Sequence, residues 1–151
     1  MKKSVIIWIV IIVVIIIGLI TWMGSQNSAP AASGPTGMIK TLTLNTATDS
    51  TLGPILVAAN GMTLYHFTQD APKVSNCSGQ CAVNWPPYIV SSDASLQAGG
   101  GAVGTVSTIT RADGTLQATY NDQPLYFWHN DTKIGDVNGQ NVGGVWFVIK
   151  P

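Results

Sequence analysis

The chain has 151 residues, of which 9% are charged, and its seven basic side chains are balanced by seven acidic ones. A neutral chain without a cluster of positive charge is poorly suited to hold phosphate backbones, so the composition argues against a nucleic-acid-binding protein. All of the acidic residues are Asp, and the shortage of Glu, Lys and Arg beside many Thr, Val and Gly disfavours a body of long helices.

The N-terminal segment predicts where the protein resides. Residues 1–3 are a short basic start, and residues 4–23 carry no charge and are mostly Ile and Val. This segment is long enough to cross a hydrocarbon core of ~30 Å as a helix, so we expect a transmembrane anchor with residues 1–3 in the cytoplasm. A cleaved signal peptide is the alternative, although its apolar region is usually only ~7–15 residues. Either interpretation places the rest of the chain outside the cytoplasm.

A linker is predicted after this segment. Residues 24–38 are small and polar and are interrupted by Pro and Gly. They bury too little surface to fold and are expected to form a flexible tether. The folded domain is therefore predicted over residues 39–151.

The remainder has the pattern of short β-strands. Polar and apolar residues alternate, as in 40–46, and apolar runs recur between turn signals without a long helical period. Strands are predicted near 40–46, 54–60, 62–68, 86–90, 103–110, 115–121, 123–129 and 144–150. Asn60-Gly61 predicts a two-residue hairpin turn of type I′, which needs positive φ at both positions, and Asn121-Asp122 is a weaker counterpart. Residues 91–104, with three consecutive glycines, are expected to form the loosest loop.

An internal repeat organises these strands. A shift of 61 residues, without a gap, superposes six identical pairs and one further aromatic pair. The pairs are Gly53 with Gly114, Asn60 with Asn121, Leu64 with Leu125, Tyr65 with Tyr126, Asp70 with Asp131, Trp85 with Trp146, and Phe67 with Trp128. The repeat predicts two similar halves that pack as one all-β domain, an antiparallel sandwich or a closed barrel, since one half alone buries too little surface.

One motif, Y-x-[F/W/Y]-x-x-D, occurs in both halves, at 65–70 and 126–131. It is accompanied by a C-x-x-x-C segment followed by W-P-P, by an R-A-D-G turn and by a G-D-V-N-G segment. In this order the residues resemble the bacterial and archaeal family of secreted repeats of unknown function, predicted lipoproteins, over residues 52–150. The resemblance implies an exported domain. Lipoproteins need a Cys just after the apolar region of the signal, and here the cysteines lie inside the domain, which implies a protein anchor in place of the lipid.

The aromatic motif positions allow two interpretations. Residues two apart on a strand share a face, so Tyr65 should stand beside Phe67, and Tyr126 beside Trp128, with a leucine before each Tyr on the opposite, apolar face. The functional interpretation is a platform that stacks on sugar rings, quinones or apolar residues of a partner. The structural interpretation, which we favour, is that these large side chains are packing pieces of a small β domain.

The two motif carboxylates, Asp70 and Asp131, also have two interpretations. A catalytic acid and base need environments that push their pKa values apart, whereas equivalent positions of a repeat receive similar environments. We therefore expect each carboxylate to accept backbone N–H groups and fix a loop. Calcium binding is a lesser alternative, because Asp131, Asp136 and Asn138 are oxygen donors, but their spacing does not match an EF-hand.

The two cysteines, Cys77 and Cys81, are expected to form a disulfide that closes a short loop, because the domain is exported. The alternative is a Zn or Cu site in which His66 and His129 join two thiolates. The two histidines do not occupy equivalent positions of the repeat, which disfavours this metal set.

Catalytic motifs such as G-x-S-x-G and H-E-x-x-H are missing from the sequence. The sequence therefore predicts no catalytic residue, no metal and no cofactor, and a membrane-anchored extracytoplasmic domain that acts as a non-catalytic binding or envelope-structural module. Its expected partners are the membrane, through the N-terminal helix, and an envelope protein or glycan. A metal-binding or redox protein of the cell surface is the alternative, and an unrecognised hydrolase is a third.

Overall fold

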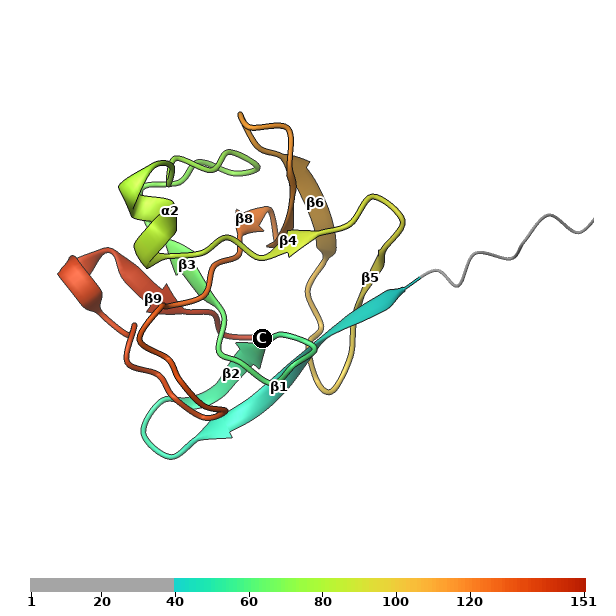
Figure 1. Cartoon of the computed structure of the whole chain (residues 1–151). Coiled ribbons are helices and arrows are strands. Elements are labelled where there is room, and N and C mark those ends of the chain that lie inside the picture. The colour runs from blue at the N-terminus through green and yellow to red at the C-terminus, as the bar shows by residue number, and fades with distance from the viewer. Residues whose placement is uncertain (1–39) are drawn as a thin grey trace, which may run out of the picture. The chain divides into compact units, whose positions relative to one another are not determined.

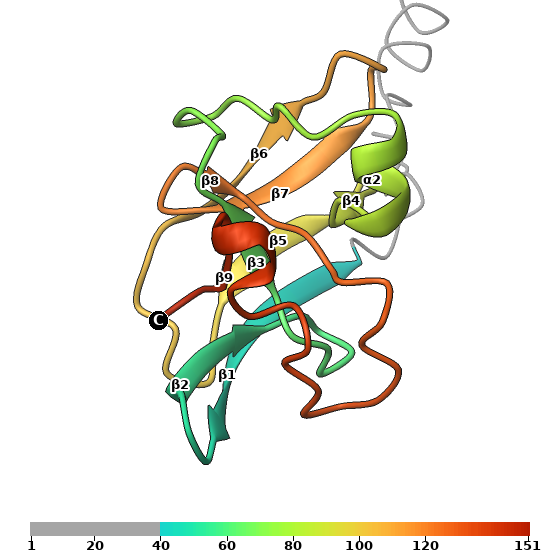
Figure 2. The same cartoon turned by 90° about the vertical axis from the view of Figure 1, so that its left-hand side faces the viewer.

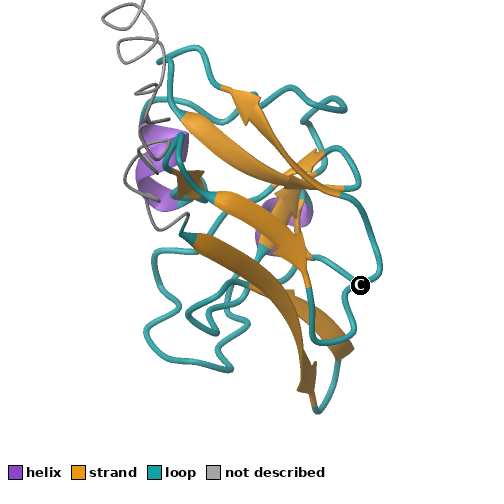
Figure 3. Cartoon of the chain, turned by 90° about the vertical axis from the view of Figure 1, so that its right-hand side faces the viewer, coloured by secondary structure: helices purple, strands orange, loops and turns teal. Residues whose placement is uncertain are grey.

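The structure, a computed structural model, describes residues 40–151, so the segments predicted at 1–3, 4–23 and 24–38 lie outside the described residues. Within residues 40–151 no helix is both long enough and apolar enough to span a membrane. This part of the chain consists mostly of strands and loops, with little helix (Figure 3). The prediction of an all-β domain is confirmed.

Most of the elements are labelled in Figure 1. In chain order the elements are β1 (Thr41–Asp49), β2 (Gly53–Val57), β3 (Tyr65–Phe67), α2 (Gln80–Asn84), β4 (Ile89–Val90), β5 (Ser95–Ala98), β6 (Val106–Thr110), β7 (Leu116–Tyr120), β8 (Gln123–Pro124), the 3-10 helix η1 (Val142–Gly144) and β9 (Trp146–Val148). The first sheet has the order β2-β1-β5, and β3 pairs with β9. In the remaining sheet β7 pairs with β4, β6 and β8.

The sheet arrangement corrects three predictions. The described strands form no closed barrel, and closure would require a continuous ring of staggered strands, whereas β4 and β8 have only two residues each. The pairing is also not wholly antiparallel, because β1 and β5 run parallel, with Leu42 opposite Leu96. β5 lies inside the segment 91–104 that was expected to be a loose loop.

Of the two predicted hairpin turns, the one at Asn60-Gly61 differs from its prediction and the one at Asn121-Asp122 is confirmed. At Asn60-Gly61 only Gly61 has positive φ, 82°, and the loop is longer than two residues. Asn60 instead accepts a hydrogen bond from Met62 N with its side-chain Oδ1, at 3.1 Å, which Asn can do at ordinary φ. Asn121 and Asp122, with φ of 49° and 66°, form the two-residue turn that the type I′ geometry requires.

The two halves exchange strands. Each half begins with an antiparallel hairpin, β1–β2 in the first and β6–β7 in the second. β3 of the first half pairs with β9 of the second, so Tyr65 lies opposite Val148. The equivalent bridge joins Tyr126 of the second half to Pro87 of the first. Figure 2 shows β3 and β9 side by side in the middle of the domain. The repeat is therefore interlocked rather than made of two separate lobes.

Two groups of buried apolar side chains lie on opposite faces of the two segments that carry the Y-x-[F/W/Y]-x-x-D motif. The leucine cluster includes Leu44, Leu56, Leu64, Tyr88, Tyr120, Leu125 and Ile149. The aromatic cluster includes Ile55, Val57, Tyr65, Cys77, Trp85, Tyr126, Trp146 and Val148. Alternation along a strand sends each motif Tyr to the aromatic cluster and the Leu before it to the leucine cluster. Both faces are thus buried at the Leu-Tyr pair that begins each motif segment.

We expect residues 39–151 to fold alone and each half, 39–104 or 105–151, to remain unfolded. Each isolated half would lack the strand that pairs with its motif. Co-expression of the two halves should restore the fold, which circular dichroism and dispersion of amide NMR signals would reveal. A dispersed spectrum from one half alone would contradict the exchange.

Candidate functional site

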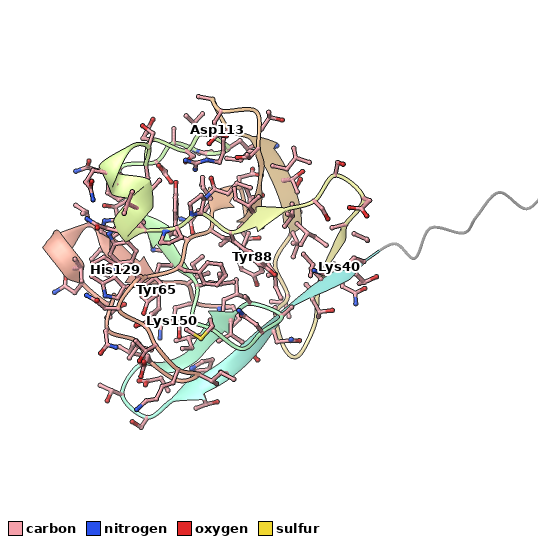
Figure 4. The ribbon with its side chains drawn as sticks, viewed as in Figure 1. Lys40, Tyr65, Tyr88, Asp113, His129 and Lys150 are labelled. Carbon is pink, nitrogen blue, oxygen red and sulfur yellow. A yellow bond between two sulfur atoms is a disulfide. The ribbon has the colours of Figure 1, made fainter. Side chains whose placement is uncertain are left out.

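The two motif segments, 65–70 and 126–131, meet at their tyrosines. The backbone N–H of Tyr65 donates to the carbonyl of Tyr126 at 2.9 Å, and the N–H of Tyr126 donates to the carbonyl of Tyr65 at 3.0 Å. A reciprocal bridge between equivalent residues relates the two halves by a local two-fold axis. Figure 4 shows Tyr65 and Tyr88 within the domain, with Asp113 and Lys40 at its rim.

The same relation governs the side chains of the motif. The hydroxyl of Tyr65 donates to Oδ2 of Asp131 at 2.6 Å, and that of Tyr126 donates to Oδ2 of Asp70 at 2.7 Å. Each tyrosine thus binds the carboxylate of the other half. Both tyrosines have 0% of their surface exposed, so these hydrogen bonds satisfy hydroxyl groups that no water reaches.

The second oxygen of each carboxylate holds a loop. Oδ1 of Asp70 accepts the N–H of Asn76 at 2.7 Å, and Oδ1 of Asp131 accepts the N–H of Asn138 at 3.0 Å. Burial raises the pKa of both carboxyls above the usual Asp value, against the opposing effect of these hydrogen bonds. The two pKa values shift in the same direction and for the same main cause, as expected for equivalent positions of a repeat.

Each hydroxyl has a second partner as well. The N–H of Gly139 donates to the oxygen of Tyr65 at 3.2 Å, and Ser75 Oγ lies 2.7 Å from the oxygen of Tyr126. Burial and the neighbouring carboxylate raise the pKa of both tyrosines well above the ordinary value. A Cβ at Gly139 would lie 2.8 Å from the ring of Tyr65, so this close approach requires glycine.

A row of stacked rings fills the aromatic cluster. Trp85 and Trp146, equivalent in the repeat, stack with centroids 3.9 Å apart and planes 5° apart. The row continues to Phe67, 4.3 Å from Trp146, and to Trp128, 4.1 Å from Trp85. Each central indole also has the Tyr of its own half against it, Tyr65 at 5.4 Å and Tyr126 at 5.1 Å. The motif aromatics are packed mainly on one another, and only Phe67 and Trp128 are partly exposed.

Cys77 and Cys81 form the predicted disulfide, and no cysteine of residues 40–151 is free. The proposed Zn or Cu set therefore loses both of its thiolates. The structure also separates the environments of the histidines: His66 is half-buried against Phe147, and the exposed His129 lies 4.5 Å from the ring of Trp128. Within the described range, no group of three or more potential metal ligands is present.

Sequence reasoning missed the buried network around Arg111. Its Nη1 donates to Ser75 Oγ at 2.7 Å and to Gln117 Oε1 at 2.6 Å, and its Nη2 donates to the carbonyl of Cys77 at 2.7 Å. The network joins the disulfide loop to Tyr126 through Ser75. Only the R-A-D-G turn marked this region in the sequence, and the turn does not indicate that Arg111 folds inward.

A groove opens beside the first motif strand, between the loop that follows β3 and the β7–β8 turn. The His66 groove has a volume of about 340 Å³ and is lined by His66, Phe67, Thr68, Asp70, Ala71, Pro72, Asn121, Gln123 and Pro124. Across the described chain, neither the imidazole of His66 nor the amide of Gln123 has a side-chain hydrogen bond. Burial lowers the pKa of His66 and so favours the neutral form of its ring.

A protein-family model described as a secreted repeat of unknown function matches residues 46–88 and 107–150. The chain belongs to this family of secreted repeats. The two matches begin 61 residues apart, which is the shift that superposes the halves. The family description supports an extracellular position for the β domain. No curated protein and no solved structure matches the chain.

We expect Asp70→Ala and Asp131→Ala each to lower the stability of this secreted-repeat domain by similar amounts. Each change leaves a buried tyrosine hydroxyl and a loop N–H without their acceptor, which costs on the order of 1–3 kcal/mol and several degrees in Tm. Thermal melts of both variants, with the exposed Asp93→Ala as a control, would measure the losses. A stabilised Asp131→Ala beside a destabilised Asp70→Ala would instead indicate that the second motif stores strain for function.

The variant with both Cys77→Ser and Cys81→Ser should remain folded with reduced stability. Closing so short a loop contributes on the order of 2 kcal/mol, and Arg111 still holds the carbonyl of residue 77. Denaturant melts would give the loss, and mass spectrometry of native protein would verify the bond. Two free thiols in exported protein, or an unfolded double variant, would contradict this account.

Proposed function

We propose that the chain is a membrane-anchored, extracytoplasmic binding module that performs no chemistry on its ligand and binds it in the His66 groove. The observation that carries the proposal is the division of polar groups in the domain. The motif tyrosines and carboxylates are hydrogen-bonded to one another. Among the described residues, His66 and Gln123 face the groove without a hydrogen bond from their side chains.

The groove fits a neutral, ring-bearing ligand such as a sugar. Phe67 and two prolines supply apolar surface, and His66 and Gln123 supply hydrogen-bonding groups, a mixture typical of small-ligand sites. The charges nearby are already matched. Asp70 uses both of its oxygens in hydrogen bonds, and Lys73 and Asp122 form an exposed ion pair at 3.5 Å. A charged ligand would therefore find no unpaired charge in the groove.

The anchoring part of the proposal rests on the sequence. Residues 4–23 are the uncharged segment and residues 24–38 are the proposed tether, which would let the domain reach a ligand in the envelope.

The alternative functions have less support. The disulfide consumes the thiolates of the metal-binding alternative, and the similar environments of Asp70 and Asp131 disfavour the hydrolase.

We expect neutral oligosaccharides built of glucose or N-acetylglucosamine to shift the amide NMR signals of the groove in the full chain. His66→Ala and Gln123→Ala should each weaken binding about tenfold, the equivalent of ~1.4 kcal/mol for one lost hydrogen bond. Lys133→Ala, an exposed change at the position equivalent to Pro72 in the other half, is the matched control and should bind normally. Absence of shifts with every sugar, or equal affinity in the His66→Ala variant, would contradict the proposal.

A further inference from the structure

The stacked rings have only one accessible end that is readily oxidised. The row runs from Phe67 through Trp146 and Trp85 to Trp128, and the two central indoles are 4% exposed. Phe67 and Trp128 occupy equivalent positions at the two ends, and both are partly exposed. Indoles lose one electron far more readily than benzene rings do. The end at Trp128 therefore exchanges an electron with a molecule outside more readily than the end at Phe67 does.

Next to Trp85 lies Tyr65, whose hydroxyl is hydrogen-bonded to a proton acceptor, Asp131. Tyr65 packs edge-on against Trp85 with ring centroids 5.4 Å apart, and its hydroxyl is 2.6 Å from Oδ2 of Asp131. A tyrosine loses its electron readily only when its hydroxyl proton can leave at the same time. The carboxylate of Asp131 is placed to take that proton, and Tyr65 is buried away from water.

We propose that Trp128, Trp85, Tyr65 and Asp131 form a one-electron relay that carries an oxidising equivalent from the surface to Tyr65. A one-electron oxidant, such as an oxidised metal complex or an inorganic radical, takes an electron from Trp128 and is reduced. Trp85 then gives an electron to Trp128. Tyr65 gives an electron to Trp85 while its hydroxyl proton passes to Asp131. The products are a neutral tyrosyl radical, a protonated Asp131 and two restored indoles.

The surrounding charges favour Tyr65 over its counterpart Tyr126. Tyr126 is linked through Ser75 to the guanidinium of Arg111, and a nearby cation opposes the removal of an electron. Among residues 40–151, no cation is hydrogen-bonded to Tyr65 or to its partner Asp131, and Tyr65 is instead within the electrostatic influence of the Asp136 carboxylate. The repeat thus supplies two similar tyrosines, and the charges around them direct the oxidising equivalent to one.

The relay can be tested by flash photolysis of the full chain in detergent, with photogenerated tris(bipyridyl)ruthenium(III) as the oxidant. Trp8→Phe and Trp22→Phe are introduced in every sample, so that only the three indoles of the β domain remain. Transient absorption and electron paramagnetic resonance distinguish indole radicals from tyrosyl radicals. We expect an indole radical that converts to a tyrosyl radical, and the tyrosyl signal should be lost in the Tyr65→Phe variant but retained in Tyr126→Phe.

Substitutions at the equivalent positions 67 and 128 test whether the stacked rings carry an electron or only pack. Trp128→Phe places at this end the residue type that the first half has, and should strongly lower the yield of the tyrosyl radical. Adding Phe67→Trp supplies an indole at the other end and should restore the radical on Tyr65, because Trp146 stacks on Trp85 and the surrounding charges favour Tyr65. Asp131→Asn can still accept the hydrogen bond but not the proton, so the indole radical should persist. Melting curves identify variants that fold. The proposal would be overturned by a folded Trp128→Phe variant with an unchanged yield of tyrosyl radical, or by a tyrosyl radical signal that remains unchanged in the Tyr65→Phe variant.

Discussion

The fold depends on two hydrogen bonds that each half can make only with the other. Tyr65 and Tyr126 are fully buried, and each hydroxyl finds its carboxylate across the local two-fold axis, at 2.6 and 2.7 Å. A buried hydroxyl without a partner costs about 1–3 kcal/mol, which is a large fraction of the stability of a domain of this size. The motif therefore specifies the pairing of the halves as well as the shape of each one.

This pairing explains why the centre of the domain is symmetric and its outer parts are not. The exchange of β3 and β9 places Trp85 against Trp146, so the equivalent indoles must fit each other. Farther from the axis the halves no longer touch their equivalents, and the residues differ. The ends of the ring stack are Phe67 and Trp128, and only the second half supplies the buried Arg111. Distinct ligand or electron-transfer properties can therefore reside at the periphery without disturbing the shared core.

The sequence predicted the equivalence of the halves but not their connection. A shift of 61 residues identifies partners such as Tyr65 and Tyr126, yet it is the same whether strands pair within a half or across halves. Gln117 is a polar residue whose burial no local pattern in the sequence predicts. The structure buries Gln117 completely, because its amide donates to the carbonyl of Leu125 and its carbonyl accepts from Arg111. Hydrogen-bond partners that come from other strands leave no local pattern in the sequence from which burial of a polar residue could be predicted.

Other local features were missed for the same reason. β5 has the sequence SLQA, which lacks β-branched residues, and it becomes a strand by pairing in parallel with β1, far away in the chain. The disulfide was predictable because it links two cysteines four residues apart in an exported segment. The His66 groove was not, because it forms between loops that only the fold brings together.

An exchanged pair of similar units is the geometry of a two-fold dimer, here contained in one chain. Two separate copies would lose translational and rotational freedom on association, and their pairing would depend on concentration. The connection through β4 and β5 replaces that cost with loop closure, which grows only slowly with loop length. It also lets the two copies differ, which a homodimer cannot do. His66 faces the groove in one half and Phe127 occupies its place in the other, so the covalent link is what permits a groove in one half to differ from its counterpart on a two-fold core.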